Sequence, residues 1–321
     1  MLKLQSVWEA NTNIRDFANV TPVLHSNFLS KDLGFELLLK AENLQTTNSF
    51  KVRGASNCLI KQKRELPSLK GVVTASSGNH GQAVAYVANT LGIPATVIMP
   101  ETAPKVKSRA VARWGAQIEF CGKTSSERLA RSKEIAMEKA YLEIPSYDHL
   151  DVIAGQGTIG IEILEQIPDV DIILVPIGGG GLISGISTLI KNQKPKIQVI
   201  GVEPEGSNSM TVSIDKGEIT QLEKTHSIAD GLLTMKPGSL TFPLAKKYVD
   251  ATLLVKESEI LQAIGICIEY FKTVPEPSGA VSVAAALKGN WGKGKKIISV
   301  VSGGNFDMEK LPDYIGQRSN A

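Results

Sequence analysis

The sequence predicts an α/β protein with two open, mostly parallel, twisted sheets that carry helices on both faces. Short apolar runs alternate with helical segments along almost the whole chain, as in sheets whose parallel strands are joined by helices. Glycine follows several of the helical segments, for example Gly92 and Gly115, where helices usually end. The length of 321 residues allows about two such units.

The predicted strands are short, mainly apolar runs bounded by glycine, proline or polar residues. They cover residues 36–40, 71–75, 95–99, 117–120, 171–175, 198–202, 251–255 and 296–301, and residues 21–23 form an extended segment. Because helical segments separate most of these runs, we expect parallel pairing.

The predicted helices place apolar residues at helical spacing. They cover residues 7–17, 82–91, 105–114, 125–139, 158–166, 182–191, 257–271 and 278–287, and another begins at Lys51. Ser49 is the expected N-cap of the helix at Lys51, which ends in a basic turn before Pro67. Residues 203–247 are less regular, and we expect mainly loops there. The pattern places domain boundaries near residues 71 and 148.

The composition excludes several classes of protein. Hydrophobic residues make up 42% and charged residues 21%, which excludes general disorder. A net charge of +3, without aromatic residues interleaved among basic ones, argues against a nucleic-acid partner. The three cysteines and four histidines have neither disulfide nor metal-ligand spacing. We find no signal-peptide core and no apolar stretch of about 18 residues, so we expect a cytoplasmic protein that does not span a membrane.

Three loops that follow predicted strands are suited to binding a ligand, because ligands of open parallel sheets bind at the carboxyl ends of strands. The first runs from Ser76 to Gly81 and reads Ser-Ser-Gly-Asn-His-Gly before a helix. Free N–H groups at a helix N-terminus, with hydroxyl and amide side chains, suit a small anion such as a carboxylate. More polar residues follow one another here than a helix cap requires, which favours a binding site over an ordinary turn.

The second loop is the glycine run Gly178–Gly181, between the strand at 171–175 and the helix at 182–191. Its backbone can close around a phosphate at a helix N-terminus. The run lacks the Gly-x-Gly-x-x-Gly and Gly-Lys-Ser/Thr patterns, which excludes the usual dinucleotide and nucleoside-triphosphate loops. The third loop, Ser302–Asn305, places a serine directly after a strand, where its hydroxyl could contact a ring nitrogen; a turn without function is the alternative.

Lys51 stands in the first turn of its helix, where the helix dipole disfavours an added positive charge and lowers the pKa of the amine. A neutral amine is what Schiff-base chemistry needs. Taken alone, Lys51 would be a surface lysine. Together with a carboxylate loop, a phosphate loop and a strand-end serine, it matches the cofactor pyridoxal 5'-phosphate, which a lysine holds as an imine.

The motifs that contain these residues resemble the serine/threonine dehydratase and serine racemase family of fold type II, whose fold is tryptophan synthase β-like. The motifs are residues 49–55 (Ser-Phe-Lys-Val-Arg-Gly-Ala), 76–82, 178–181 and 302–305, with 152–158 and 228–231 as further signatures. The resemblance covers nearly the whole chain, in the right order. It implies a large cofactor-binding domain of residues 1–70 and 149–321, and a small mobile substrate domain of residues 71–148.

The resemblance also implies a role for each matching residue. Lys51 would hold the cofactor and remove the Cα proton, with Phe50 packed beside the ring. Asn79 would bind the phenolic oxygen of the cofactor, and Ser302 its pyridine nitrogen. The cofactor phosphate would lie on Gly178, Gly179, Gly180 and Gly181, and the substrate carboxylate on Ser76, Ser77, Asn79 and His80. A purely structural hydrogen bond is the alternative role of His80.

Two residues bear on the choice between elimination and racemisation. Ser77 occupies the place of the serine that serine racemases use as the base on the face opposite the lysine, where many bacterial dehydratases have alanine. Dehydratases with this serine also exist. Arg128 resembles a racemase arginine that reaches the substrate from the small domain, and a helix-surface arginine is the equal alternative.

Two positions depart from the family pattern. Asn48 stands where a glycine usually precedes Ser-Phe-Lys, and asparagine tolerates positive φ better than most residues. Ser209 replaces the aspartate that accompanies a glutamate such as Glu203 in the divalent-cation site of the family. Loss of a carboxylate weakens binding of Mg²⁺ or Ca²⁺, so we assign no metal ligand. The chain ends soon after Asn305, and we expect no regulatory domain.

We therefore expect a pyridoxal-phosphate-dependent ammonia-lyase that converts L-serine and L-threonine into a 2-oxo acid and ammonia, and the resemblance implies a homodimer. Ser77 and Arg128 support an alternative, a serine racemase or a 3-hydroxyaspartate dehydratase or racemase. Cysteine synthase and threonine synthase relatives usually carry Lys-Asp-Arg, whereas this chain has Lys51-Val52-Arg53. A cofactor-binding protein without catalysis and a nucleotide-binding domain are the alternatives from other classes.

Overall fold

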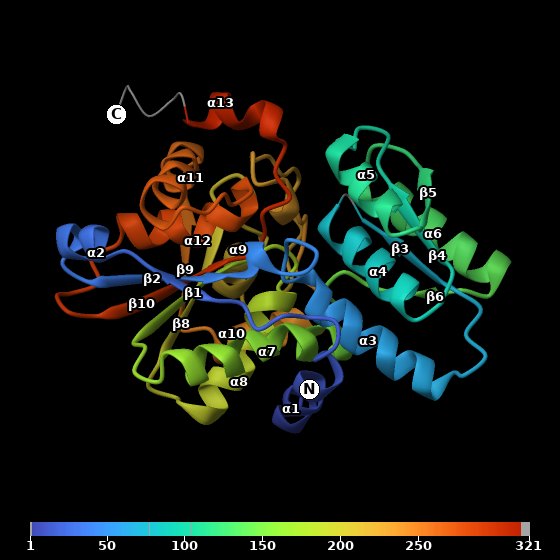
Figure 1. Ribbon diagram of the computed structural model, residues 1–321, viewed down its shortest axis with the longest axis horizontal. Coiled ribbons are helices and arrows are strands. Elements are labelled where there is room, and N and C mark those ends of the chain that lie inside the picture. Colours follow the sequence, from blue (N-terminus) through green and yellow to red (C-terminus); the bar gives the residue numbers. More distant parts are fainter. Residues whose placement is uncertain (1, 77, 104, 316–321) are drawn as a thin grey trace.

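The computed structural model describes residues 2–76, 78–103 and 105–315, and these form two separate sheets (Figure 1). The larger sheet has the strand order β1-β2-β10-β7-β8-β9, and the smaller sheet has the order β5-β4-β3-β6. Among the described residues, every strand pair is parallel except β1 with β2. The two sheets confirm the predicted fold class.

The strands are β1 (Val23–His25), β2 (Glu36–Ala41), β3 (Val72–Ala75), β4 (Ala95–Met99), β5 (Gln117–Phe120), β6 (Leu142–Glu143), β7 (Ile172–Pro176), β8 (Gln198–Pro204), β9 (Ala251–Val255) and β10 (Lys296–Val301).

Helices fill most of the chain between the strands. They are α1 (Leu4–Asn13), α2 (Asn27–Leu33), α3 (Lys51–Glu65), α4 (Asn79–Thr90), α5 (Lys105–Arg113), α6 (Ser125–Lys139), α7 (Leu150–Gln166), α8 (Gly181–Gln193), α9 (Ser209–Lys216), α10 (Thr241–Tyr248), α11 (Glu257–Phe271), α12 (Pro277–Lys288) and α13 (Leu311–Ile315), with short 3₁₀ turns η1 (Glu42–Leu44), η2 (Asp230–Leu232) and η3 (Met308–Lys310). In the part of the chain that the structure describes, none of these helices combines the length and apolar character needed to cross a bilayer.

Helices cover both faces of the larger sheet because its strands direct apolar side chains to both sides. Along β2, Leu37 and Leu39 belong to the core that the sheet shares with α11 and α12, whereas Leu38 belongs to the core shared with α7 and α8. All three side chains are buried. Figure 1 shows α11 and α12 above this sheet and α7, α8 and α10 below it.

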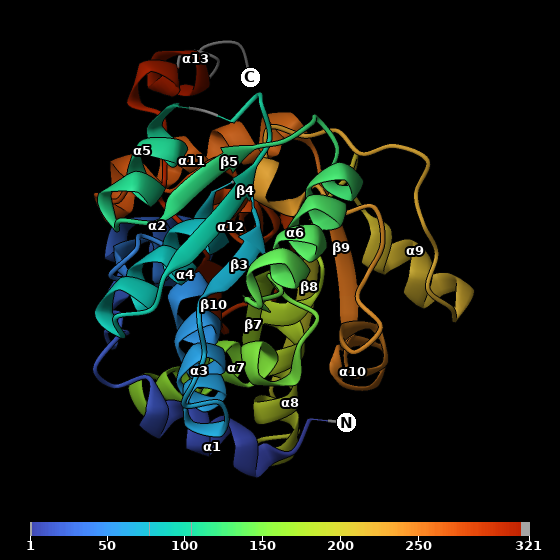
Figure 2. The same cartoon turned by 90° about the vertical axis from the view of Figure 1, so that its right-hand side faces the viewer.

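The smaller sheet follows the same alternation. Val97 and Met99 of β4 pack with Val111 of α5, whereas Ile98 packs with Ile135 of α6. Figure 2 shows α4 and α6 on opposite sides of these strands. All four strands of this sheet lie between Val72 and Glu143 in the chain.

Helix α3 connects the two units and packs against both. Val52 and Leu59 of α3 share a core with Val84 of α4 and Val152 of α7. Helix α7 approaches α3 closely because Gly155 has no side chain: a Cβ at this position would lie 2.5 Å from the carbonyl oxygen of Arg53. This close packing explains why α7 begins at Leu150 rather than at the predicted residue 158. Glycines reduce helix propensity in the sequence, but here they permit the tertiary contact that stabilises the helix.

Other boundaries also differ from the prediction. The first helix is Leu4–Asn13 instead of residues 7–17, and α4 begins at Asn79, three residues before the predicted start. Helix α2 was not predicted, although the Ser26 hydroxyl caps it and Gly34, in the left-handed conformation, ends it. The segment 203–247, expected to be mainly loop, contains α9, η2 and α10.

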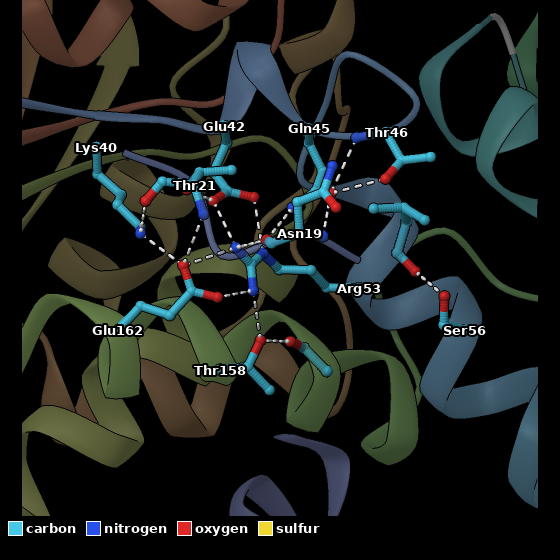
Figure 3. A network of polar contacts seen from close by, with 12 residues as sticks. Asn19, Thr21, Lys40, Glu42, Gln45, Thr46, Arg53, Ser56, Thr158 and Glu162 are labelled. Atoms are coloured by element: carbon cyan, nitrogen blue, oxygen red, sulfur yellow. Dashed lines mark hydrogen bonds and ion pairs between the residues drawn. The ribbon is translucent and has the colours of Figure 1, made fainter. Parts of the chain in front are cut away.

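A buried network of charged side chains holds the first turn of α3 (Figure 3). The Arg53 guanidinium donates to both oxygens of Glu42, at 2.7 and 2.8 Å, and to both oxygens of Glu162, at 2.6 and 3.0 Å. Lys40 donates to Glu162 at 2.5 Å and to the Thr21 carbonyl at 2.7 Å. Two cations thus balance two carboxylates, and the four side chains are at most 5% exposed. The network joins β2, η1, α3 and α7.

We predict that Arg53→Met lowers the free energy of unfolding by about 3–5 kcal/mol, because it leaves two buried carboxylates with only Lys40 to compensate them. Urea denaturation monitored by circular dichroism measures the change. Lys296→Met is the matched control, since it breaks the Lys296–Asp169 pair at the surface, where solvent screens the charges, and should lower the free energy of unfolding far less. Equal losses in the two variants would contradict a structural role of the network.

Candidate active site

The three loops singled out in the sequence surround one cavity of about 400 Å³. Its lining combines the ends of β3, β7 and β10 with the start of α3 and with side chains from the smaller sheet and its helices. The predicted residues that line it are Phe50, Lys51, Ser76, Asn79, His80, Arg128, Gly178, Gly179, Gly180, Gly181 and Ser302. Ser77 lies outside the described residues. The structure therefore brings together, around one cavity, groups that come from distant parts of the chain.

Lys51 begins α3 and reaches into the cavity. Its Nζ donates to the Ser146 carbonyl at 2.8 Å and lies 5.1 Å from the centre of the Phe50 ring. Burial lowers the pKa of Lys51 to about 8, and the nearby Glu276 carboxylate only partly opposes this shift. The lowered pKa agrees with the prediction, but desolvation is the main cause, whereas the prediction relied on the helix dipole.

The predicted N-cap of α3 was wrong. Phe50 occupies the N-cap position with helical dihedral angles, and no side chain caps the helix. Ser49 instead forms an isolated antiparallel β-bridge with Gly303 through its backbone, just before the helix begins. Asn48 adopts φ of +53°, a left-handed conformation that asparagine tolerates better than most residues.

The loop that begins at Ser76 closes onto the N-terminus of α4. The Ser76 hydroxyl accepts from the N–H groups of Gly78 and Gly81, at 3.1 and 2.9 Å. His80 Nε2 lies 3.0 Å from the Ile144 carbonyl, and burial together with the charge of Lys51 lowers the pKa of His80 to about 3. The imidazole is therefore neutral, with the proton on Nε2 and Nδ1 as an acceptor. This contact favours the structural alternative for His80.

The glycine run forms a cradle without side chains at the N-terminus of α8. Gly180 has φ of +95°, and a Cβ there would lie 2.6 Å from Met210 Cε. A Cβ on Gly179 would overlap the ring of Tyr147. The Thr241 hydroxyl donates to the Gly179 carbonyl at 2.6 Å and keeps the loop in place. Only glycine fits these positions, and the helix dipole favours an anion at this end of α8.

The third loop joins the start of α4 to the segment before α3 through Asn305. Asn305 Nδ2 donates to Asn79 Oδ1 at 2.8 Å and to the Thr47 carbonyl at 3.1 Å. The Ser302 carbonyl accepts from Phe50 N at 3.1 Å, and the Ser302 hydroxyl donates to the Ser278 carbonyl at 3.3 Å. The start of α3, the start of α4 and the end of β10 therefore form one hydrogen-bonded unit.

Segment 144–148 closes one side of the cavity, and sequence analysis did not identify it. The Ser146 carbonyl accepts from Lys51, and Tyr147 packs on the glycine run. The Asp148 carboxylate accepts from the backbone N–H groups of Ser239 and Leu240, each at 2.8 Å, and so anchors the segment to the start of α10. These residues belong to no motif, because their function depends on contacts with distant parts of the chain.

A group of charged side chains in the cavity was also missed. Lys107 of α5 donates to Asp230 of η2 at 2.5 Å and lies 3.9 Å from Glu276. Glu276, which precedes α12, accepts a hydrogen bond from Asn79 Nδ2. A glutamate directly before Pro-Ser-Gly at a helix start was the only sequence signal, and it suggests a helix terminus rather than a binding site.

Arg128 is buried and lines the cavity, so the alternative of a helix-surface arginine was wrong. Its guanidinium donates to the carbonyl of Thr124 at 3.0 Å, and Thr124 forms a capping box with Glu127 at the start of α6. The start of this helix therefore positions the arginine at the cavity wall.

Glu203, on β8, and Ser209, the first residue of α9, lie outside this cavity. The Glu203 carboxylate accepts from Met210 N at 3.0 Å and from Thr211 N at 2.8 Å, and burial raises the pKa of Glu203 to about 7. Among the described residues, no group of three or more His, Cys, Asp or Glu side chains could hold a metal ion. Glu203 thus serves as a cap of α9.

Comparisons with known proteins agree closely in sequence and in structure. A family model described as pyridoxal-phosphate dependent enzyme matches residues 14–303. The L-threonine ammonia-lyase of Thermotoga maritima is 43% identical over 317 residues, which are 99% of this chain and 79% of that protein. The structure of maize serine racemase superposes with a TM-score of 0.93 at 38% identity and covers 98% of this chain and 97% of its own. The processed form of threonine deaminase isoform 2 from Solanum lycopersicum has a TM-score of 0.92 at 34% identity, over 99% of this chain and 89% of its own.

The lowered pKa of Lys51 predicts a pH-dependent stability. Burial disfavours the charged amine, so below about pH 8 the charge of Lys51 lowers the free energy of unfolding of the cofactor-free protein. This penalty disappears as the pH rises from about 8 toward 10.5. Lys51→Met should therefore raise the free energy of unfolding at pH 7, by up to about 3 kcal/mol. At pH 9.5 the gain should be clearly smaller.

Urea denaturation of both proteins at the two pH values measures this difference. Lys61→Met, on the same helix, is the control, because the hydrogen bond and charge of Asp151 raise the pKa of Lys61 despite its partial burial. That variant should lose stability at pH 7. An equal gain for Lys51→Met at both pH values would contradict the lowered pKa.

Proposed function

The chain belongs to the family of pyridoxal-phosphate-dependent enzymes, and on this premise we propose that it is an ammonia-lyase that converts L-threonine and L-serine into 2-oxo acids and ammonia. The family match confirms the resemblance seen in the motifs. Relatives named threonine ammonia-lyase and threonine dehydratase, at 40–43% identity over nearly the whole chain, support this reaction.

The residues of the cavity fit pyridoxal phosphate. The cradle at Gly179 and Gly180 has no room for a side chain and lies at the N-terminus of α8, which suits a phosphate. Lys51 offers an amine with a pKa of about 8, and Asn79 and Ser302 line the same cavity. When bound, the cofactor supplies an electron sink for the pair left at Cα. The observation that carries the proposal is this joint placement of a readily deprotonated lysine and a phosphate cradle.

The residues of the chain account for the other requirements of the reaction. Lys51, partly neutral near pH 8, takes the proton from Cα of the substrate and holds it on Nζ. The loop from Ser76 to His80 lies at the helix N-terminus and receives the substrate carboxylate. The β-hydroxyl leaves with this proton as water, and hydrolysis of the resulting enamine by one water gives the 2-oxo acid and ammonia.

The proposal also covers the roles of the two domains, the oligomeric state and the divalent cation. Residues 1–70 and 149–321 bind the cofactor, and residues 71–148, which contain the smaller sheet, bind the substrate and move. The protein acts as a cytoplasmic homodimer. A divalent cation has no part in the proposal, because Glu203 is occupied by the backbone of α9.

Racemisation of serine is the second candidate. Structures named serine racemase and aspartate racemase superpose with TM-scores of 0.93 and 0.91, and Arg128 lines the cavity. In this candidate, Ser77 supplies the second base. A racemase adds a proton to the opposite face of Cα and leaves the β-hydroxyl in place. A lyase instead releases the β-hydroxyl.

We predict that the holoenzyme releases 2-oxo acid from L-threonine and L-serine, and that Lys51→Ala lowers turnover by more than about 1,000-fold. Lys61→Ala, on the same helix but outside the cavity, should keep the wild-type rate. A coupled assay for the 2-oxo acid, with chiral analysis of the remaining serine, distinguishes the candidates. D-Serine without 2-oxo acid would favour the racemase, and full turnover by Lys51→Ala would refute both.

A further inference from the structure

Glu276 is a buried carboxylate inside the cavity and has no part in the reaction described above. Its side chain is 2% exposed, and Oε1 accepts a hydrogen bond from Asn79 Nδ2. Its backbone N–H donates to the Gly303 carbonyl at 3.0 Å, and a Cβ on Gly303 would overlap Oε1. The glycine at 303 therefore leaves the space that the carboxylate occupies.

The contacts of Asn79 determine which way its amide faces. A carboxylate oxygen accepts from the amide nitrogen on one side, and Asn305 Nδ2 donates to the amide oxygen at 2.8 Å on the other. Reversing the amide would place two oxygens together at Glu276 and two N–H₂ groups together at Asn305. One N–H of Asn79 is used by Glu276, which leaves one for a ligand in the cavity.

Charged side chains from three elements and one amide surround Glu276. Lys107 of α5 lies 3.9 Å from Oε2 and pairs with Asp230 of η2, while Lys51 of α3 and the amide of Asn79 of α4 are also close. Burial raises the pKa of Glu276 to about 7, which Lys107 opposes and Asp230 increases. Within the described part of the chain, Oε2 is buried and has no hydrogen-bond partner. A buried acceptor without a partner costs free energy, so its retention in this cavity points to a function.

We propose that Glu276 is a positioning residue of the cofactor site: it fixes the Asn79 amide so that the second N–H of Asn79 faces the oxygen of a bound pyridoxal phosphate. The proposal rests on the cofactor of the proposed function, but not on the reaction that the enzyme catalyses. Glu276 acts through Asn79, and the charge of Lys107 favours the ionised carboxylate against the effect of burial.

The test uses the holoenzyme and two readouts other than turnover: the absorption band of the bound cofactor and the loss of cofactor on dialysis. Glu276→Leu removes the acceptor, so its band should shift and its cofactor affinity should fall about tenfold. Glu276→Gln retains an amide oxygen that can accept from Asn79 and should stay close to wild type in both readouts. A wild-type band in Glu276→Leu would overturn the proposal.

A double-mutant cycle tests whether Glu276 acts through Asn79. Asn79→Ala should shift the band by itself, and adding Glu276→Leu should change the affinity no further. Additive effects would show that the two residues act independently and would refute the inference. If Glu276→Leu does not fold, Glu276→Asp, which withdraws the carboxylate from Asn79, replaces it and should show the same shift.

Glu203→Leu is the matched control, because it removes another buried carboxylate, which lies outside the cavity. The Glu203 carboxylate accepts two backbone hydrogen bonds. Both leucine variants should melt at a lower temperature, and only Glu276→Leu should alter the absorption band. A holoenzyme that binds the cofactor but releases no 2-oxo acid would refute the proposed reaction while leaving this comparison intact.

Discussion

The position of Lys51 depends on the pairing of Arg53 with two carboxylates. The guanidinium binds Glu42 and Glu162 with two hydrogen bonds each, which fixes the first turn of α3 against η1 on one side and α7 on the other. Buried charges of this kind are tolerated only when each is satisfied, and here two cations balance two carboxylates. Lys51 lies in the same turn of α3 as Arg53, so its amine enters the cavity at a defined place.

Burial has the same chemical effect on three different groups in the cavity: it favours the neutral form. It lowers the pKa of Lys51 to about 8 and that of His80 to about 3, and it raises the pKa of Glu276 to about 7. Lys51 and Glu276 therefore both change charge within a narrow range near neutral pH.

The sequence predicted the structure best where a residue's conformation depends on its neighbours in the chain. Strands were found from apolar runs, and the glycine run and the positive φ at Asn48 follow from backbone geometry. It was less informative where a contact spans a long separation. Glu276 contacts Asn79 across 197 residues, and no pattern near either residue reports that contact. The start of α7 was misplaced for a related reason, since Gly155 weakens the local signal but permits contact with α3. Ser49 was taken for a cap because its bridge to Gly303 cannot be read from neighbouring residues.

Asn305 connects loops that are far apart in the chain, and this has a consequence for how the protein is made. Its side chain binds Thr47 across 258 residues and Asn79 across 226. A growing polypeptide leaves the ribosome from its N-terminus, so the lysine helix and the loop at Ser76 exist for most of the synthesis without the residue that joins them. The cavity can therefore be completed only after residue 305 has emerged from the ribosome.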